Sequence, residues 1–576
     1  MKETVVPAGR AFLRAMEKSG IGYVFSSPGS EWPPVWEALA DRSEGGPSKL
    51  QYINCRHEAL AVNLATGYAK ATRKTQLVLL HASVGPLNAA MALRSAYQER
   101  VPMLICAGES AAFGEDDRLA DPGGQWLHDL CDLGGPADML RRCVKWSERV
   151  LSPAVLIPSL ERALQIAAEP PAGPVLLGVP FEWLMEEVRF RDDERPNQVI
   201  RATQVEEEAI QKAVALLVEA KRPVILTEHS GQDPESVSCL VEICELLRVP
   251  VMEPYRPAFL NFPRNHPLYL SYDRNYLETS DLILLVGAVS PWYPANKAPG
   301  AGAKVLAVGE EFPHSRLPFW GYSVDLALVG PVAGILKRIA QGVKAAGEFS
   351  SRQAAREEGY RAIKEEHDRQ AHRVESQGME HSTEIPIDPR WLCYVLNQAL
   401  PPDAVIVEET TVHRTLIQSM IRRDQPMSHF GRITGGLGIG LGYALGVKLA
   451  MKERPVFALI GDGAFHYNPV VACLGSAQEY QLPIIIVVFN NGRYGSMERS
   501  LLRYFPDGAA KRTGIHHGAP IEPNPDYRRL AEAYGGYGIR VEDPGDIERS
   551  VAEALKYDAV GKFSLIDVVL SDFSPR

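Results

Sequence analysis

Short apolar runs recur along this 576-residue chain, each bounded by glycine, proline or polar residues. Between them lie longer stretches with the character of helices that cover a sheet. This alternation is typical of βαβ units and predicts parallel sheets covered by helices. The expected strands are residues 23–25, 76–80, 102–106, 174–179, 223–226, 250–252, 281–286, 303–308, 404–407, 456–460 and 482–489.

The strands fall into three groups, which predict three α/β domains. A charged, proline-containing stretch at 189–197 ends the first group, and a highly charged stretch at 351–368 precedes the third. We expect domains at 1–190, 203–345 and 386–576, with a charged linker at 346–385. The charged stretch reads as a solvated helix that crosses between domains, and a partner-binding helix is the alternative.

Composition narrows the class of protein. The net charge of −10 argues against a nucleic-acid partner, because phosphate binding relies on clustered lysine and arginine. Eight cysteines without regular spacing are typical of reduced, mostly buried thiols. No apolar run has the length of a membrane span, and the first ten residues have no apolar signal segment. We therefore expect a cytoplasmic enzyme without membrane contact.

The most informative motif is Gly461-Asp462-Gly463, followed after 26 intervening residues by Asn490-Asn491. It predicts a strand, a tight turn that opens a helix, and a second strand that ends in two amides. A carboxylate and a carboxamide then meet at the carboxyl edge of a parallel sheet. Such oxygen ligands suit Mg²⁺, and glycines before a helix suit a diphosphate. The plain alternative is an ordinary βαβ crossover with a chance aspartate and asparagine pair.

This spacing resembles the cofactor signature of thiamin-diphosphate enzymes. A second segment, Arg56-His-Glu58 followed by Gly67-Tyr-Ala-Lys, resembles another part of the same family. The resemblance implies three doubly wound parallel-sheet domains: pyrimidine-binding, central and diphosphate-binding. It assigns Glu58 the hydrogen bond to N1′ of the aminopyrimidine, which promotes formation of the thiazolium ylide. From this residue alone, stabilisation of a helix amino terminus would be the favoured role of Glu58, and the two family segments in the right order reverse that preference.

Further cofactor and metal residues follow from the resemblance. The Gly435 carbonyl would accept from the 4′-amino group, and Leu437 would be the apolar wedge that holds the cofactor in its V shape. The metal ligands would be Asp462, the side chain of Asn491 and the backbone carbonyl of Arg493. The expected contacts of the diphosphate are Thr410, Thr411, His413, Gly463 and Tyr467.

Within the superfamily the chain is most similar to the branch of benzoylformate decarboxylase, with acetolactate synthase and benzaldehyde lyase further away. Ser30 matches a serine that contacts the substrate carboxylate, and His81 matches a histidine that relays protons. The central domain lacks a second catalytic histidine at 287–294. Arg432 replaces a small thiol, so we expect a more polar pocket and a substrate other than benzoylformate.

The segment 504–525 is rich in proline and glycine and is expected to be an ordered loop rather than a helix. It could be a lid or channel wall that carries His516 and His517 as proton donors, or a surface insertion. FAD looks doubtful, because only Gly231 stands near a phosphate-binding position after residues 224–227.

The expected activity is non-oxidative decarboxylation of a 2-oxo acid through ylide and enamine intermediates, with acyloin-forming carboligase capability. An acetolactate-synthase-like or benzaldehyde-lyase-like carboligase or C–C lyase is the first alternative, and a catalytically silent cofactor binder is the second. The cofactors would be thiamin diphosphate and Mg²⁺. The partners would be a 2-oxo acid, an aldehyde or ketone acceptor, and further copies of the chain in a homodimer or homotetramer.

Overall fold

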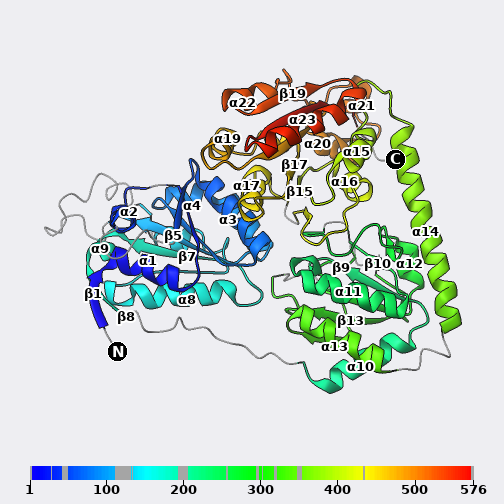
Figure 1. Cartoon of the computed structure of the whole chain (residues 1–576), viewed down its shortest axis with the longest axis horizontal. Helices are drawn as coiled ribbons and strands as arrows, with labels where there is room; N and C mark the ends of the chain where they lie inside the picture. The colour runs from blue at the N-terminus through cyan, green and yellow to red at the C-terminus, as the bar shows by residue number, and fades with distance from the viewer. Residues whose placement is uncertain are drawn as a thin grey trace. The chain divides into compact units, whose positions relative to one another are not determined.

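The computed structural model contains three six-stranded α/β sheets and one small two-stranded antiparallel sheet (Figure 1). It describes residues 3–27, 29–41, 50–110, 131–132, 134–191, 205–254, 257–292, 298–300, 302–316, 321–346, 353–432 and 435–572. Three domains built on parallel sheets are therefore confirmed. All eleven strands expected from the apolar runs are present.

The N-terminal sheet has the strand order β3-β2-β4-β5-β7-β6, and all its pairs are parallel. Its strands are β2 (Tyr23–Ser26), β3 (Gln51–Asn54), β4 (Gln76–Leu80), β5 (Met103–Glu109), β6 (Trp146–Arg149) and β7 (Pro174–Pro180). Its helices are α1 (Ala8–Lys18), α2 (Pro33–Ala40), α3 (Glu58–Thr72), α4 (Val84–Asn88), α5 (Ala90–Gln98), α7 (Gly135–Met139), α8 (Leu156–Ala168) and α9 (Phe181–Met185). An antiparallel pair, β1 (Glu3–Pro7) and β8 (Glu187–Arg191), brings the two ends of this domain together.

The central sheet has the order β11-β10-β9-β12-β13-β14, again parallel. Its strands are β9 (Pro223–Thr227), β10 (Val251–Met252), β11 (Tyr269–Leu270), β12 (Leu282–Val286), β13 (Lys304–Gly309) and β14 (Leu326–Val329). Its helices are α10 (Glu207–Glu219), α11 (Pro234–Leu247), α12 (Arg274–Thr279) and α13 (Val332–Ala345).

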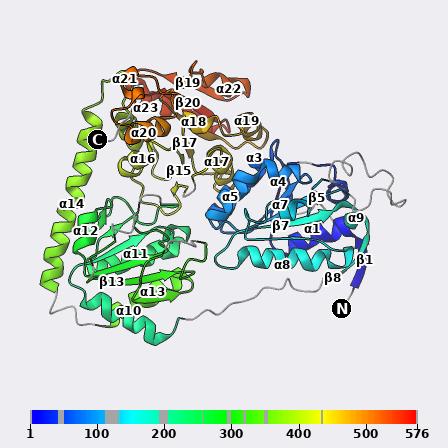
Figure 2. The ribbon, with the colours of Figure 1, turned by 180° about the vertical axis from the view of Figure 1, so that it is seen from behind.

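The charged stretch before the third domain forms one long helix, α14 (Gln353–Met379). In Figures 1 and 2 it runs from the central domain to the C-terminal domain. His367 anchors it to the central sheet, since its Nδ1 lies 2.8 Å from the carbonyl oxygen of Tyr269. The crossing helix expected from the charge pattern is therefore present.

The C-terminal sheet has the order β16-β15-β17-β18-β20-β19. Its strands are β15 (Val405–Glu409), β16 (His429–Phe430), β17 (Val456–Gly461), β18 (Ile484–Asn490), β19 (Tyr537–Val541) and β20 (Ser564–Val569). Its helices are α15 (Pro389–Ala399), α16 (Arg414–Met420), α17 (Gly440–Ala450), α18 (Asp462–Phe465), α19 (Val470–Glu479), α20 (Gly495–Tyr504), α21 (Ala509–Thr513), α22 (Arg528–Ala533) and α23 (Ile547–Ala559).

By its internal contacts the chain divides into two compact units rather than three. Unit 1 comprises residues 1–200, 434–453 and 465–484, and unit 2 comprises residues 201–433, 454–464 and 485–576. Unit 1 thus combines the N-terminal domain with α17 and α19. Among the described residues, no helix combines the length and the apolar character that crossing a bilayer requires.

The packing of α3 against α17 in unit 1 depends on glycines in both helices. A Cβ built on Gly67 would lie 2.1 Å from the Tyr443 carbonyl oxygen, and one on Gly446 would lie 2.1 Å from the Leu64 carbonyl oxygen. The two backbones therefore approach too closely for any side chain at these positions.

Gly446→Ala should lower the free energy of unfolding by about 1–3 kcal/mol, because the added methyl group overpacks a backbone contact. The measurement is the apparent melting temperature. Gly359→Ala is the matched control, since a Cβ at this position of α14 meets nothing within 4 Å. That change should leave the melting temperature unchanged or raise it slightly. Equal behaviour of the two variants would contradict the packing argument.

Candidate functional site

The GDG turn and the NN pair lie side by side in unit 2. Asp462 directly follows β17, and Asn490 ends β18, the neighbouring strand of the same sheet. The Asp462 carboxylate is buried, and its two oxygens accept hydrogen bonds from the backbone N–H groups of Gly463 and Gly492, each at 2.7 Å. These bonds fix the carboxylate at the carboxyl edge of the sheet, where ligands of open α/β sheets bind.

The three expected metal ligands converge at this edge. One end of the Asn491 side-chain amide lies 3.3 Å from Asp462 Oδ1 and 3.1 Å from the Arg493 carbonyl oxygen. If that end is the amide nitrogen, it donates to both; if it is the oxygen, three oxygens meet without a proton between them. Neighbouring ligands of octahedral Mg²⁺ are about 3 Å apart, because each lies about 2.1 Å from the ion. The contacts as they stand are those of the amide nitrogen donating to both oxygens, and with the amide oxygen turned to this side the two distances from Asn491 fit a small divalent cation.

Burial raises the pKa of Asp462 to about 7, although three backbone N–H groups act in the opposite direction. The neighbouring Asp567 carboxylate adds to the rise. An ionised Asp462 thus lacks sufficient compensation from the protein alone. A bound cation would supply the missing positive charge.

The side chain of Asn490 is engaged in hydrogen bonds within the protein, and its Oδ1 accepts from the Gly492 N–H at 3.2 Å. Its Nδ2 donates to Asp567 Oδ1 at 2.8 Å, and its amide exchanges two hydrogen bonds with the amide of Asn524 at 3.0 and 3.1 Å. Asn490 therefore connects β18, β20 and the segment 504–525.

The segment 504–525 differs in part from the expected loop, because it contains the short helix α21. The residues Ala509-Ala-Lys-Arg512 favour a helix, and Gly514 ends it with a φ of +70°. Beyond α21 the chain returns to the turn that follows Asn491. The Tyr494 N–H donates to the Ala519 carbonyl at 2.7 Å, and the Ile521 N–H donates to the Gly492 carbonyl at 2.8 Å.

The two histidines of this segment have different surroundings. The His516 imidazole is half-buried and paired with the Glu498 carboxylate of α20, whereas His517 is exposed. Glu498 also pairs with the Arg493 guanidinium at 3.1 Å. The segment is thus bonded directly to the turn at 491–494, which a freely attached surface insertion would not be.

The expected diphosphate residues after β15 differ in what they can offer. The amide and the hydroxyl of Thr410 both donate to the buried Glu408 carboxylate. Arg414 Nε donates to the other oxygen of Glu408 at 3.0 Å. In this conformation Thr410 has its donors turned inward, while Thr411 is exposed. Arg432 is buried and lies near the same turn, with Nη2 3.5 Å from the Thr410 carbonyl oxygen.

His413 is fully enclosed at the start of α16. Its ring lies 5.4 Å from the ring of Phe489 between centroids. Burial, helped by the positive charge of Arg499, lowers the pKa of His413 to about 3. The imidazole is therefore neutral at physiological pH and can donate one hydrogen bond.

Unit 1 contains the residues expected to contact the organic part of the cofactor. Glu58 is the first residue of α3. Its Oε2 accepts a hydrogen bond from Asn88 Nδ2 at 2.6 Å, and its side chain is 20% exposed. One carboxylate oxygen is thus held by the protein.

The Gly-rich loop before α17 packs against α3 and α5 in the same unit. Asn63 Nδ2 of α3 donates to the Gly438 carbonyl at 3.0 Å. Gly438 has a φ of +88°, and a Cβ there would lie 2.3 Å from the Tyr467 carbonyl oxygen. Leu437 is half-buried and Gly435 is exposed. The structure therefore places Glu58, Gly435, Leu437 and Tyr467 in unit 1, whereas Asp462, Gly463, Asn491, Arg493, Thr410, Thr411 and His413 belong to unit 2.

The substrate candidates Ser30 and His81 follow β2 and β4, which are adjacent strands of the N-terminal sheet. Both contact Glu31, which was not among the expected site residues. Ser30 Oγ lies 3.4 Å from Glu31 Oε1, and His81 Nδ1 lies 2.9 Å from Glu31 Oε2.

The central domain presents a carboxylate at the edge where a dinucleotide would bind. Glu228 follows β9, and its Oε2 accepts from the backbone N–H groups of Val289 and Ser290 at 2.7 and 3.3 Å. These two amides are thus engaged by an anion of the protein itself. Trp292, two residues after Ser290, is buried. Residues 293–294 lie outside the described residues. The expectation that FAD does not bind stays a prediction.

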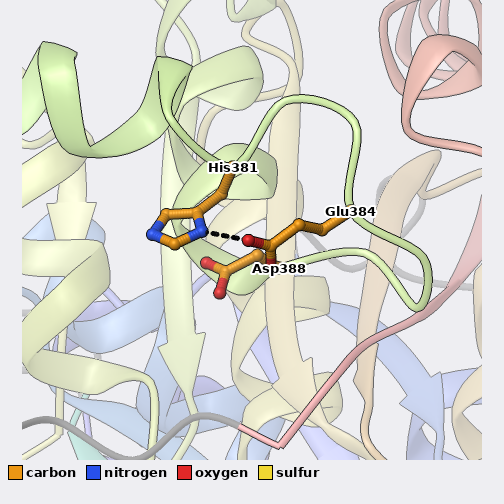
Figure 3. Close-up of side chains that lie close together, drawn as sticks. All are labelled: His381, Glu384 and Asp388. Carbon is orange, nitrogen blue, oxygen red and sulfur yellow. Dashed lines mark hydrogen bonds and ion pairs between the residues drawn. The ribbon is translucent and has the colours of Figure 1, made fainter.

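A further cluster of possible metal ligands, His381, Glu384 and Asp388, follows α14 (Figure 3). His381 Nδ1 lies 2.6 Å from Glu384 Oε1. Both oxygens of Asp388 accept from the Arg390 guanidinium, at 2.8 and 2.7 Å, and Oδ1 also caps α15. Because Asp388 is engaged in this way, the cluster reads as an ion-pair and capping arrangement.

Four residues of these sites had no assigned role from the sequence: Glu31, Asn88, Glu408 and Asn524. Glu31 directly follows Ser30, and Asn88 follows His81 in the same short stretch, so these neighbours could have indicated them. Asn524 meets Asn490 across 34 positions, and no local pattern indicates that contact.

Three sequence models of one family match successive parts of the chain. The N-terminal TPP binding domain of thiamine pyrophosphate enzymes matches residues 7–132, their central domain matches residues 210–339, and their C-terminal TPP binding domain matches residues 410–568. The chain therefore belongs to the thiamine pyrophosphate enzyme family.

Relatives extend over nearly the whole chain at low identity. Benzoylformate decarboxylase of Pseudomonas aeruginosa is 27% identical, covering 96% of this chain and 97% of its own. Acetolactate synthase isozyme 3 large subunit of Escherichia coli is 25% identical, covering 97% and 94%. A solved structure of Rhodococcus jostii thiamine diphosphate-dependent 4-hydroxybenzoylformate decarboxylase has a TM-score of 0.80 at 25% identity, covering 99% of this chain and 100% of that one.

Proposed function

We propose that this chain is a thiamin-diphosphate- and Mg²⁺-dependent enzyme that decarboxylates a 2-oxo acid without oxidation. The observation that carries the proposal is the convergence of Asp462, Asn491 and Arg493 on one point at the edge of the C-terminal sheet. The decarboxylases among the relatives support the reaction class. Carboligase capability belongs to the proposal, because the same chemistry can add the retained carbon to a second carbonyl compound.

In this proposal the three residues hold the cation, which in turn binds the diphosphate. Gly463 leaves room beside the Tyr494 ring, since a Cβ there would lie 2.8 Å from Cδ1 of that ring. Thr411, His413 and Tyr467 contribute contacts to the diphosphate. Thr410 would join them only if its hydroxyl turns away from Glu408.

The bound cofactor supplies a carbon nucleophile and holds the electrons that remain when carbon dioxide leaves. The residues of unit 1 would contact the organic part of the cofactor and the 2-oxo acid substrate. Glu58 would hydrogen-bond the ring nitrogen N1′ of the cofactor, the Gly435 carbonyl would accept from its 4′-amino group, and Leu437 would pack against it. Ser30 orients the substrate carboxylate, and His81 moves protons.

A second candidate is an acetolactate-synthase-like or benzaldehyde-lyase-like carboligase, which the similarity to acetolactate synthase favours. A substrate screen separates the two. The enzyme is incubated with Mg²⁺, thiamin diphosphate and pyruvate, phenylglyoxylate or longer 2-oxo acids, and aldehyde is assayed against acyloin. We expect aldehyde from at least one acid, with acyloin when an acceptor aldehyde is added. Acyloin as the sole product would contradict the decarboxylase.

We further propose that the enzyme works as a homodimer or homotetramer, as the resemblance implies. Light scattering coupled to size exclusion gives the mass of the species that carries activity. An active species of about the 63.4 kDa of one chain would contradict this proposal. A catalytically silent cofactor binder is the remaining alternative, and the exchange experiment described in the Discussion distinguishes it.

A further inference from the structure

Two side chains meet at the switch point of the N-terminal sheet. The chain leaves β2 for β3 on one side and then returns to β4 on the other, so that β2 and β4 are neighbours with diverging connections. Open α/β sheets bind ligands in the crevice at such a point. Glu31 follows β2, and His81 is the first residue after β4.

The contact between them is a carboxylate–imidazole pair. His81 Nδ1 lies 2.9 Å from Glu31 Oε2, which is hydrogen-bond distance. The Glu31 side chain is 3% exposed and the His81 side chain is 25% exposed. The carboxylate is therefore enclosed, while the imidazole reaches the surface of the crevice.

Two glycines make the space for this pair. A Cβ built on Gly29 would lie 2.5 Å from Glu31 Oε2 and 2.5 Å from His81 Nδ1, and one on Gly108 of β5 would lie 2.6 Å from Glu31 Cβ. The next residue, Trp32, is fully buried, and its Nε1 donates to the Leu80 carbonyl at 2.9 Å. The backbones that carry Glu31 and His81 are thus tied together.

Two further carboxylates lie on segments that neighbour the pair, and one of them is paired with an arginine. Within the described part of the chain, the ion-pair partner of Glu31 is His81. Glu58 begins α3 near the same turn, since its Cγ lies 3.6 Å from a Cβ built on Gly85. Glu109 at the end of β5 pairs with Arg149 at 2.5 Å. These surroundings favour a proton on Nδ1 of His81, directed at the carboxylate.

We propose that Glu31 is a positioning residue that fixes the His81 ring and its Nδ1–H, so that Nε2 is the nitrogen that exchanges a proton with the bound 2-oxo acid. This inference rests on the proposed function. In the step, Nε2–H gives its proton to the carbon that has lost carbon dioxide, and the neutral imidazole regains a proton from water. The Nδ1 proton stays on the bond to Glu31, and nothing is oxidised or reduced.

The first test needs neither substrate nor cofactor. Carbethoxylation of His81 by diethyl pyrocarbonate, followed by peptide mapping, reports the neutral imidazole as a function of pH. In Glu31→Gln the midpoint of this pH profile should move to lower pH by about one unit, because an opposite charge within hydrogen-bond distance is lost. Glu31→Asp, which keeps the charge, should retain most of the wild-type midpoint. Glu37→Gln removes an exposed carboxylate of α2 and should leave it unchanged.

The second test uses turnover of a 2-oxo acid found in the screen. Glu31→Gln should reduce it about 10²-fold with cofactor binding retained, and Glu31→Asp should restore part of it. An unchanged carbethoxylation midpoint in Glu31→Gln would overturn the inference, and so would unchanged turnover. A wild-type enzyme that turns over no 2-oxo acid would instead overturn the proposed function, while the carbethoxylation profile still decides the pairing of Glu31 with His81. If Glu31→Gln does not fold, the wild-type profile decides: a midpoint below about 6.5, the value of a free imidazole, would overturn the pairing with Glu31.

Discussion

Glu58→Gln is expected to lower turnover of the 2-oxo acid by about 10³-fold or more, with thiamin diphosphate and Mg²⁺ still bound. Asn88 holds Oε2 of Glu58 at 2.6 Å, so the other oxygen remains for the ring nitrogen N1′. An amide is nearly the same size, but it lacks the negative charge that favours a proton on that nitrogen. The direct measurement is the rate at which the C2 proton of bound cofactor exchanges for deuterium, followed by NMR after acid quench.

Glu37→Gln is the matched control for this experiment, because it removes one carboxylate from an exposed position of α2. It should exchange and turn over at the wild-type rate. Exchange at the wild-type rate in Glu58→Gln would remove Glu58 from its proposed role. A wild-type protein that binds the cofactor but does not exchange C2 would favour the silent binder.

Most of the strands that the apolar runs predicted are buried on both faces, although the buried interior strand β20 was not predicted. β4, β5 and β12 are fully buried along their length, and a continuous apolar run is then the expected signal. The edge strands β3 and β6 expose half or more of their residues, so their sequences carry polar side chains and no clear run. Sheet edges were therefore missed for a physical reason.

The contacts of α3 with α17 show why the composition of the compact units could not be predicted from the order of segments along the chain. Linkers at 189–197 and 346–385 suggest three separate domains, yet α17 and α19 pack with the N-terminal domain in one compact unit. The glycines at 67, 442 and 446 permit the close approach, but a glycine in a helix does not name its partner. Sequence separation alone carries no information about that pairing.

The candidate site was predictable where its residues belong to one motif. The 26-residue spacing indicated that Asp462 and Asn491 meet, and the structure brings them within 3.3 Å. The partners that orient such residues come from elsewhere. Thr410 is turned inward by Glu408, and Asn490 is held by Asn524 and Asp567. These contacts depend on tertiary packing, which no local pattern encodes.

Asp462→Asn is expected to abolish binding of Mg²⁺ and thiamin diphosphate without destabilising the protein that lacks them. Burial raises the pKa of Asp462 to about 7. Between about pH 4 and pH 7 the folded protein therefore holds a proton on this carboxylate that the unfolded chain has lost. Stability from this group is present below about pH 4 and is lost as pH rises through about 7. At pH 8 the ionised carboxylate therefore costs the cofactor-free fold up to a few kcal/mol (about 1.4 kcal/mol per unit of pKa). Asparagine avoids this cost, which outweighs the one accepted backbone hydrogen bond that its amide nitrogen gives up, worth about 1 kcal/mol.

The measurement is the melting temperature at pH 8 with and without Mg²⁺ and thiamin diphosphate, together with calorimetric titration of the cofactor. Wild type should melt higher when both are present, since ligands of the folded state stabilise it by mass action. Asp462→Asn should melt at or above the cofactor-free wild type and gain nothing from the ligands. Asp507→Asn, an exposed position in the segment 504–525, is the control and should respond like wild type. A lower melting temperature for cofactor-free Asp462→Asn would mark Asp462 as a structural residue, and retained binding would exclude it as a ligand.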